Sequence, residues 1–115
     1  MIKKGKVVLG VVEEITVHSK KTKKVMARID TGATKSSIDE TLAEQLGLGP
    51  VIGKRLVKSA HGSKERPFID VTITIGGKKT TNHFTLINRN HMKYSVLIGR
   101  NILRQGFLID PEKKC

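Results

Sequence analysis

An aspartate stands at the end of a strand-like segment, where this residue type is uncommon. Residues 27–37 read ARIDTGATKSS, so that Asp30 follows the apolar Ile29 and leads directly into Thr31 and Gly32. Aspartate is depleted in β-strands, and a glycine two residues later indicates that the backbone turns tightly or comes close to another group. Asp30 is therefore a candidate for a carboxylate that takes part in proton transfer, and the alternative is a structural Asp-Thr-Gly turn.

Length and composition limit the kind of protein that positions this carboxylate. The 115 residues fit one small domain, expected to span residues 1–115, and the 37% hydrophobic and 28% charged residues are typical of a soluble globular protein. No run of about 18 apolar residues is present, and the basic N-terminal segment lacks the pattern of a signal peptide. The only cysteine, Cys115, excludes an internal disulfide and predicts a reducing compartment such as the cytoplasm.

The net charge is strongly positive. The chain has 22 Lys and Arg residues against 10 Asp and Glu, a formal charge of +12, which indicates an anionic partner such as nucleic acid, a membrane surface or an acidic substrate. The alternative is a charged surface that only faces solvent. Aromatic residues form 3% of the chain, which disfavours a protein that stacks the bases of single-stranded nucleic acid.

The hydrophobic patterns predict a mainly β protein. Strands are expected over residues 6–17, 24–30, 51–60, 67–75, 78–87, 94–98 and 106–111. Residues 1–24 would supply a hairpin strand and its basic turn. Residues 36–49, in which Ser37 or Asp39 can cap the start, predict a short helix, and residues 100–105 predict another helical turn. Together these elements predict a closed, barrel-like β-domain with one or two short helices.

Two of these segments together resemble the retropepsin family of aspartic proteases. One is IDTGAT, where a strand ends at Asp30, and the other is LIGRNIL, where an apolar strand ends at Gly99 before a helix. Members of this family carry a D-T-G-A loop and, near the C-terminus, a segment often written I-G-R-N-L-L. The resemblance covers about residues 25–110 and implies a retropepsin-like closed β-barrel.

One group of retropepsin-like proteins is more similar still. The segments ARIDTGAT, VKSAHGSKERP, NRNHMKYSVLIGRNIL and FLIDP resemble proteins usually labelled ATP-dependent zinc proteases, which are linked to RimK-type ligases that add glutamate tails to proteins. The zinc in that label has no counterpart in this sequence. H-E-x-x-H and C-x-x-C are both missing, and His83 and His91 lack a recognised ligand spacing, so we expect no metal and no other cofactor.

The resemblance implies a homodimeric active site. An aspartic protease needs two carboxylates that share one proton, so that one activates water as a base while the other acts as an acid. This sequence contains a single Asp-Thr-Gly, because Asp39, Asp70 and Asp110 are each followed by other residues. The second carboxylate is therefore expected from Asp30 of a second copy across a two-fold axis.

The resemblance also implies roles for residues around the carboxylate. The expected parts are the active-site loop Thr31, Gly32 and Ala33, a flap at residues 58–66 with its tip at Ala60, His61 and Gly62, and a support beneath the loop formed by Leu97, Ile98, Gly99 and Arg100. One position departs from the retroviral pattern. Thr34 stands where retroviral proteases have an acid that pairs with the arginine of I-G-R-N, so Arg100 must find another partner.

Arg28 is a candidate residue of the substrate-binding surface. It lies two residues before Asp30, and because strand side chains alternate, both should lie on one face. A guanidinium there suits carboxylates, and together with the charge of +12 it predicts a preference for acidic, glutamate-rich substrates. The alternative is that Arg28 pairs with Glu13 or Glu14 on the neighbouring strand.

Three functions remain open at this point. The sequence favours a cytoplasmic, homodimeric aspartic endopeptidase that acts on a peptide or protein substrate. The alternatives are a retropepsin-like domain that binds a peptide or protein partner without cleaving it, and a basic β-barrel that binds nucleic acid. We expect no association with a membrane.

Overall fold

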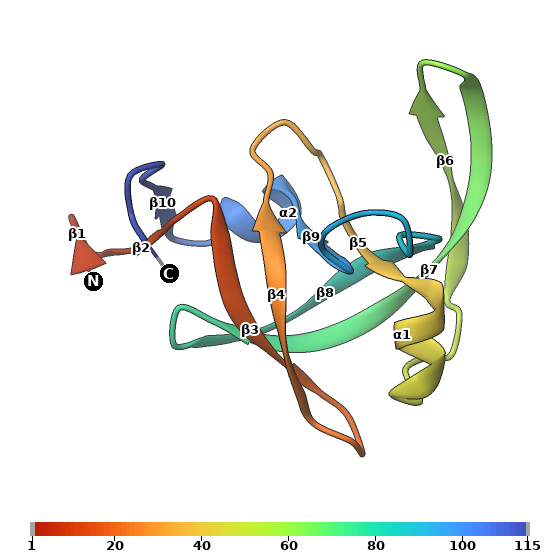
Figure 1. Cartoon of the computed structure of the whole chain (residues 1–115), viewed down its shortest axis with the longest axis horizontal. Coiled ribbons are helices and arrows are strands. Elements are labelled where there is room, and N and C mark those ends of the chain that lie inside the picture. The colour runs from red at the N-terminus through yellow and green to blue at the C-terminus, as the bar shows by residue number, and fades with distance from the viewer. Residues whose placement is uncertain (1, 115) are drawn as a thin grey trace.

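The computed structural model describes residues 2–114, which form ten strands and two short helices (Figure 1). The strands are β1 (Ile2–Lys3), β2 (Lys6–Leu9), β3 (Val12–His18), β4 (Lys23–Ile29), β5 (Ser36–Asp39), β6 (Gly53–Ser59), β7 (Gly62–Ile75), β8 (Lys78–Ile87), β9 (Val96–Ile98) and β10 (Phe107–Ile109). The helices are α1 (Glu40–Gln45) and α2 (Arg100–Leu103). Cys115, on which the expectation of a reducing compartment depends, lies outside the described residues.

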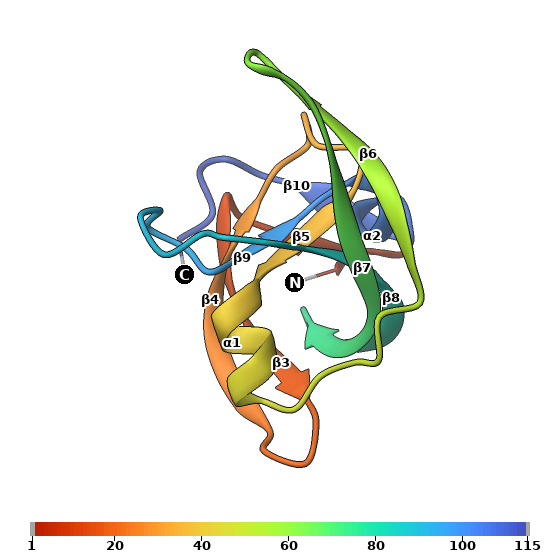
Figure 2. The same ribbon diagram turned by 90° about the vertical axis from the view of Figure 1, so that its right-hand side faces the viewer.

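Six of the strands close into a barrel. Their order is β3-β4-β9-β5-β8-β7, and the barrel closes where Thr16 and Val17 of β3 pair with Thr74 and Ile73 of β7. Strand β6 extends this sheet beyond β7 as an edge strand. Figures 1 and 2 show the strands wrapping around one interior, so the expected mainly β, closed-barrel fold with two short helices is confirmed.

The hydrophobic core is filled by aliphatic side chains and two phenylalanines, Phe84 and Phe107. Side chains of a strand alternate between the core and the outside, as in β7. Ile69, Val71 and Ile73 are buried, whereas Asp70 is exposed. The other fully buried large side chains include Leu9, Ile15, Ile38, Ile75, Phe84, Ile98 and Ile102. Burying one such side chain stabilises the fold by about 1.5–3 kcal/mol, so this cluster is the main source of stability for the loops that it carries.

The first and last strands form a separate three-stranded sheet in the order β1-β2-β10. It lies at the end of the molecule opposite the β6–β7 hairpin (Figure 1). The prediction of one strand over residues 6–17 is wrong here, because the chain leaves β2 at Gly10 and changes sheets. A side chain at Gly10 would place its Cβ 2.7 Å from the carbonyl oxygen of Lys113, so the close C-terminal segment requires glycine at this bend.

The boundary predicted for the first helix is also wrong. Residues 36–39 form strand β5 between β8 and β9, and only Glu40–Gln45 is helical. Asp39 caps this helix, as one of the two expected caps, because its Oδ2 accepts a hydrogen bond of 3.2 Å from the backbone N–H of Leu42. The serines of β5 hide its strand character in the sequence, and pairing with strands distant in the chain decides it.

Strand β7 is longer than expected. It begins at Gly62 rather than at residue 67, because residues 62–68 pair with β6 along its whole length. The polar residues of this segment lay outside the two expected strands, but cross-strand hydrogen bonds do not depend on apolar side chains. Only Ala60 and His61 separate the two strands.

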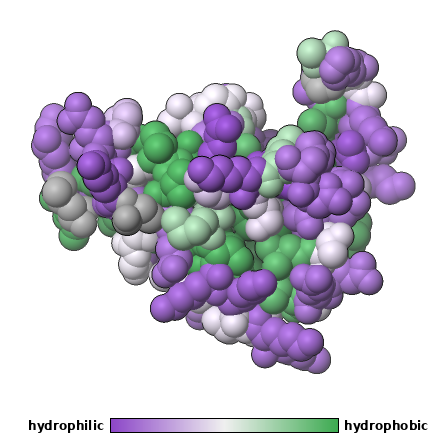
Figure 3. Space-filling model, in the orientation of Figure 1, coloured by the Kyte–Doolittle hydropathy of each residue, from purple (hydrophilic) through white to green (hydrophobic). Residues whose placement is uncertain are grey.

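Polar side chains cover the projecting parts of the molecule. Figure 3 shows hydrophilic residues over the β6–β7 hairpin and the terminal sheet, with hydrophobic patches over the body of the barrel between them. The two helices of the described chain have six and four residues, far too few to cross a lipid bilayer.

Candidate functional site

The chain leaves β4 in a tight loop that begins at Asp30. The backbone N–H of Asp30 donates to the carbonyl oxygen of Ile98 at 2.9 Å, and Oδ1 of its carboxylate accepts from the backbone N–H of Gly32 at 2.9 Å. Asp30 is half-buried, whereas Thr31 and Gly32 are exposed. Within residues 2–114, Oδ2 of Asp30 accepts no hydrogen bond. The loop therefore orients the carboxylate through one oxygen and leaves the other available.

Residues 97–100 support this loop, and Gly99 makes the close contact possible. A Cβ at Gly99 would lie 2.6 Å from the carbonyl carbon of Lys35 and 2.9 Å from the carbonyl oxygen of Ala33, closer than real Cβ atoms come. The next residue, Arg100, donates its backbone N–H to that Ala33 oxygen at 2.8 Å. Leu97 and the fully buried Ile98 continue the support as part of β9. The two motifs that the sequence linked are thus in direct contact.

The side chain of Arg100 also holds the loop. Its Nη1 donates to the carbonyl oxygen of Thr31 at 2.9 Å, and its Nη2 donates to the hydroxyl of Thr34 at 3.0 Å. These are the partners of Arg100 where the retroviral pattern has an acid. One guanidinium therefore ties both sides of the loop together without an ion pair.

A polar pair beneath the loop, the buried Ser36 and the half-buried Asn101, was not recognised in the sequence. The hydroxyl of Ser36 donates to Oδ1 of Asn101 at 2.7 Å and accepts from the backbone N–H of Gly99 at 2.9 Å. Asn101 in turn donates through Nδ2 to the carbonyl oxygen of His83 at 3.0 Å. The only signal was their position beside the two motifs, in TKSS and GRN. This network joins β5, β8 and α2 beneath the residues expected to be functional.

A cleft of about 820 Å³ opens beside the loop. Its walls come from residues 32–37, from residues 55–58 of β6, and from Phe68, Thr85, Ile87, Arg89 and Leu97. Among the expected site residues, Gly32, Ala33 and Leu97 line it. Asp30 and Arg28 do not border this cleft in a single chain, nor do Ala60, His61 and Gly62 at the hairpin tip.

The β6–β7 hairpin forms one wall of the cleft and extends beyond it. Figures 1 and 2 show the hairpin projecting from the barrel on the side where the loop after β4 lies. Its tip residues Ala60, His61 and Gly62 are exposed. The segment expected to be a flap is therefore a real hairpin next to the candidate site.

Arg28 is exposed on β4 and pairs in register with Val12 and Leu97. Glu13, one of its two alternative partners, is engaged elsewhere. Its Oε2 accepts from Nζ of Lys113 and from the backbone N–H of Gly10, each at 2.6 Å. Glu13 is therefore not the partner of Arg28, and among the described residues no ion pair within 4.0 Å joins Arg28 to Glu14 either.

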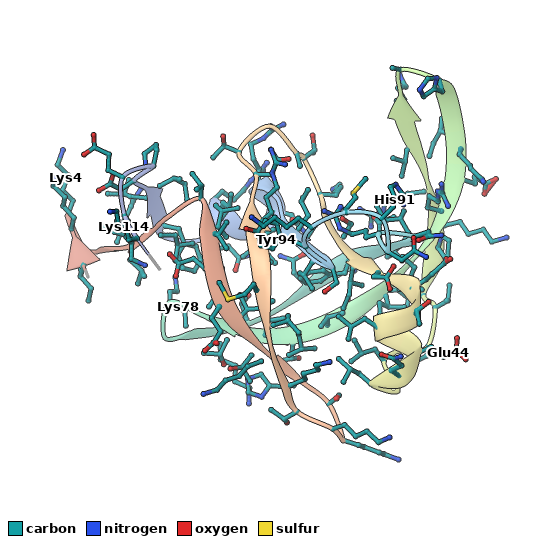
Figure 4. The ribbon with its side chains drawn as sticks, viewed as in Figure 1. Lys4, Glu44, Lys78, His91, Tyr94 and Lys114 are labelled. Carbon is teal, nitrogen blue, oxygen red and sulfur yellow. The ribbon has the colours of Figure 1, made fainter. Side chains whose placement is uncertain are left out.

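Arg89, a residue that the sequence did not single out, is 6% exposed and lines the cleft. It lies at the start of the loop between β8 and β9, the same loop that carries His91 and Tyr94 in Figure 4. Its Nε donates to the carbonyl oxygen of Tyr94 at 2.9 Å, and its Nη1 donates to the hydroxyl of Ser37 at 3.3 Å. In a polar stretch reading NRNH, nothing in the sequence predicts burial.

The charges of the site act on Arg89 in opposite directions. Burial lowers the pKa of Arg89 and the positive charge of Arg28 lowers it further, whereas the carboxylates of Asp39 and Asp30 raise it. Arg89 therefore lies within electrostatic reach of both Arg28 and Asp30. The candidate carboxylate, the exposed arginine and the buried arginine belong to one electrostatic environment.

The histidines are placed separately. His83 pairs with Asp70 through an Nδ1–Oδ1 distance of 2.7 Å and packs edge-on against the ring of Phe68, whereas His91 lies in the β8–β9 loop. In the part of the chain that the structure describes, no three His, Cys, Asp or Glu side chains gather closely enough to hold a metal ion.

Comparison with sequence families gives one match over most of the chain. A family model named RimB-like and described as "Retropepsin-like aspartic endopeptidase RimB" matches residues 41–115. This segment contains the cleft residues of β6 to β9 and the support formed by residues 97–100, and it begins after Asp30.

Curated relatives match about half of the chain. A probable alpha-L-glutamate ligase of Desulfotalea psychrophila is 36% identical over 67 residues, and one of Shewanella pealeana is 33% identical over 64 residues. The matches cover 57% and 55% of this chain but only 14% of each relative. The chain thus corresponds to a small part of these longer proteins.

Solved structures share the fold. A Legionella pneumophila protein of unknown function has a TM-score of 0.70 at 21% identity, with coverage of 94% of this chain and 95% of that chain. The simian foamy virus protease has a TM-score of 0.61 at 24% identity, with coverage of 81% and 91%. The foamy viral protease-reverse transcriptase bound to an RNA/DNA hybrid has a TM-score of 0.59 at 22% identity, with coverage of 81% and 12%.

Proposed function

The chain belongs to the RimB-like family of retropepsin-like aspartic endopeptidases, and we propose that it is a homodimeric endopeptidase in which Asp30 of each copy activates water. The observation that carries this proposal is the geometry of Asp30. Its carboxylate stands at the end of β4, is oriented by the N–H of Gly32 through Oδ1, and keeps Oδ2 available. Hydrogen bonds from the loop to Ile98 of β9 and from Arg100 of α2 hold the carboxylate in this position.

The second carboxylate of the dyad comes from a second copy. The other aspartates of the chain are engaged elsewhere: Asp39 binds the backbone N–H groups of Leu42 and Arg89, Asp70 pairs with His83, and Asp110 accepts from the N–H of Glu112. Thr31 and Gly32, by contrast, are exposed next to Asp30. A two-fold axis beside this loop brings two Asp30 carboxylates together.

The chemistry then follows from the shared proton. The ionised Asp30 takes a proton from water while the water oxygen bonds to the carbonyl carbon of the peptide. The protonated Asp30 of the other copy donates to the substrate. Transfer of a proton to the amide nitrogen then breaks the C–N bond and releases an amine and a carboxylic acid. The network beneath the loop contributes by holding the two carboxylates in position.

The charge of the cleft supports a preference for acidic peptides. Its lining includes Lys35, Arg55, Lys58 and Arg89 and contains no Asp or Glu. The ligase name of the curated relatives fits a substrate that contains glutamate. In this proposal Arg28 lies at the rim of the dimeric cleft, the β6–β7 hairpin acts as the flap, and the protein works in the cytoplasm.

The test is cleavage of glutamate-rich peptides, followed by mass spectrometry of the products, with wild-type protein and Asp30→Asn. Wild type should cleave at defined bonds. Asp30→Asn should cleave roughly 10²- to 10⁴-fold more slowly while it still binds the peptide. Peptide binding without cleavage by wild type, at concentrations that give a dimer, would support a binding domain instead. Sequence-tolerant, salt-dependent nucleic-acid binding without peptide cleavage would support the basic-barrel alternative.

A further inference from the structure

Two arginines from different elements line the cleft, and neither has a carboxylate partner. Arg89 follows β8, and Arg55 lies on β6 in the hairpin wall. Among the described residues, the side-chain ion pairs within 4.0 Å are His83 with Asp70 and Lys113 with Glu13. Neither guanidinium therefore forms a close ion pair with a described residue, although the carboxylates of Asp39 and Asp30 act on Arg89 from farther away.

The guanidinium group of Arg89 is held in place by hydrogen bonds, but some of its N–H donors have no acceptor among the described residues. Its Nε and Nη1 donate to Tyr94 and Ser37, while within residues 2–114 Nη2 has no hydrogen-bond partner. The backbone of the same residue is anchored, because its N–H donates to Oδ1 of Asp39 at 2.7 Å. A guanidinium has five N–H donors in a fixed plane, so the protein uses two of them to orient the group and leaves the others for a ligand.

Arg55 is half-buried and lines the same cleft from strand β6. Its guanidinium carbon lies 4.0 Å from the centroid of the Phe68 ring, a cation–π contact. Its Nε is buried and has no hydrogen-bond partner in the described chain. An unsatisfied buried donor on a charged group costs free energy unless a ligand completes it.

We propose that Arg89 and Arg55 form a carboxylate-binding subsite that takes an acidic side chain of the substrate next to the scissile bond. The subsite lies next to the bond because the same cleft is lined by Gly32 and Ala33 of the Asp30 loop. This inference rests on the proposed function, because the occupant is the peptide that the Asp30 dyad cleaves. It differs from the role expected for Arg28, which does not line this cleft in one chain.

The lining favours an aspartate or glutamate side chain over other anions. Planar guanidinium groups match planar carboxylates through paired N–H donors. The remaining wall is apolar, with Leu56, Val57, Ile87 and Leu97, and suits the methylene groups of a glutamate. Arg89 belongs to the barrel and Arg55 to the hairpin, so a bound carboxylate joins the two and draws the hairpin over the cleft.

The first experiment measures binding separately from cleavage. Oligoglutamate and oligoglutamine peptides, both fluorescein-labelled and amidated at the C-terminus, are titrated with full-length Asp30→Asn protein by fluorescence anisotropy. The glutamate peptide should bind more tightly, and Arg55→Gln or Arg89→Gln in this background should weaken it by roughly tenfold or more, with little change for glutamine. Arg55→Lys should restore only part of the affinity, because an ammonium group lacks the planar fork.

The matched control is Lys54→Gln. This exposed lysine neighbours Arg55 on β6 and does not line the cleft, so the variant removes the same charge without removing the subsite. It should change binding of the glutamate peptide less than about twofold, as expected for a solvated surface charge. Because Arg89 also holds the β8–β9 loop, Arg55→Gln keeps the test valid if Arg89→Gln fails to fold.

The second readout is the kinetics of peptide cleavage, measured with protein that keeps Asp30. Arg55→Gln should raise KM for an acidic peptide much more than KM for a neutral peptide, whereas Lys54→Gln should leave both values close to those of wild type, a split that general loss of structure does not produce. Equal binding of glutamate and glutamine peptides, or an equal loss with Lys54→Gln, would overturn the subsite. So would stronger competition by inorganic phosphate than by glutarate.

The two proposals fail in different ways. Cleavage by wild type with no preference for glutamate leaves the endopeptidase standing and removes the subsite. Arg55-dependent binding of oligoglutamate without any cleavage by wild type leaves the subsite standing and removes the endopeptidase.

Discussion

Arg100 of helix α2 donates through Nη2 to the hydroxyl of Thr34 at 3.0 Å, across the loop that begins at Asp30. The same guanidinium binds the carbonyl oxygen of Thr31. The contact links the two motifs, Asp-Thr-Gly and Ile-Gly-Arg, through a neutral acceptor where retroviral proteases are expected to have an acid. A substitution at the exposed Thr34 should therefore change the stability of the loop and, through it, the activity of the protein.

Replacing Thr34 tests this link. Thr34→Val removes the acceptor and should lower the free energy of unfolding by about 0.5–1 kcal/mol, near the low end for a hydrogen bond because the site is exposed. Thr34→Asp, which provides an acid for Arg100, should preserve or slightly raise stability. Denaturant unfolding measures both. Equal stability of Thr34→Val and wild type, with unchanged exchange of the loop amides, would show that the contact contributes nothing.

Gly99 should tolerate no side chain. Gly99→Ala forces a methyl group against the backbone of Lys35 and Ala33, which cannot move aside as a side chain can, so we expect a loss of about 3 kcal/mol or more and loss of peptidase activity. Gly77→Ala is the control, because Gly77 has a positive φ but open space around it, and its cost should be about 1–2 kcal/mol. Thermal unfolding compares the two variants. A Gly99→Ala protein as stable as Gly77→Ala would contradict the close contact.

Mixing subunits tests the shared dyad. If each active site needs Asp30 from two copies, adding excess Asp30→Asn protein to wild type should suppress activity, because most wild-type chains then pair with an inactive partner. Analytical ultracentrifugation over a concentration series should show a dimer, at least with a peptide ligand. Activity that ignores the excess variant, or a monomer under all conditions, would oppose a homodimeric site.

The β6–β7 hairpin should be the most dynamic part of the site. Strand β6 has a partner on one side only, and Ala60 and His61 at the tip are exposed. Amides at residues 60–65 should exchange rapidly in the free protein and slow down when a peptide binds. Amides of β8, paired on both sides, serve as the internal reference. Strong protection of residues 60–65 without a ligand would exclude a gating role.

Arg28 should contribute to the preference for acidic peptides. Compared with wild type, Arg28→Leu should cleave acidic peptides less efficiently and neutral peptides equally well, because a rim charge acts mainly on charged ligands. Met26→Leu is the control, since Met26 is exposed on the same face of β4 and carries no charge. Cleavage of acidic, neutral and basic peptide libraries gives the measurement. If Arg28→Leu kept the same preference for acidic peptides, Arg28 would have no role in substrate recognition.

The sequence by itself determined the features that depend on local backbone and alternation. Asp30 followed by Gly32 indicated a tight loop, and the resemblance to retropepsins implied that residues 97–100 lie beneath it. The structure places the two segments in contact. The alternation of apolar and polar residues in the expected strand over residues 67–75 likewise matches the buried and exposed sides of β7. These signals are readable because each depends on a residue's own conformational limits or on the two-residue period of a strand.

Only the tertiary structure decided the features that depend on distant partners. Gly10 divides the first predicted strand because the C-terminal segment passes close to it, and β5 is a strand because β8 and β9 lie on either side. Arg89 looks like a residue of a polar loop, yet it is buried where that loop crosses the cleft. Burial and pairing are set by chain segments far away in the sequence, so no local pattern of residue types contains them.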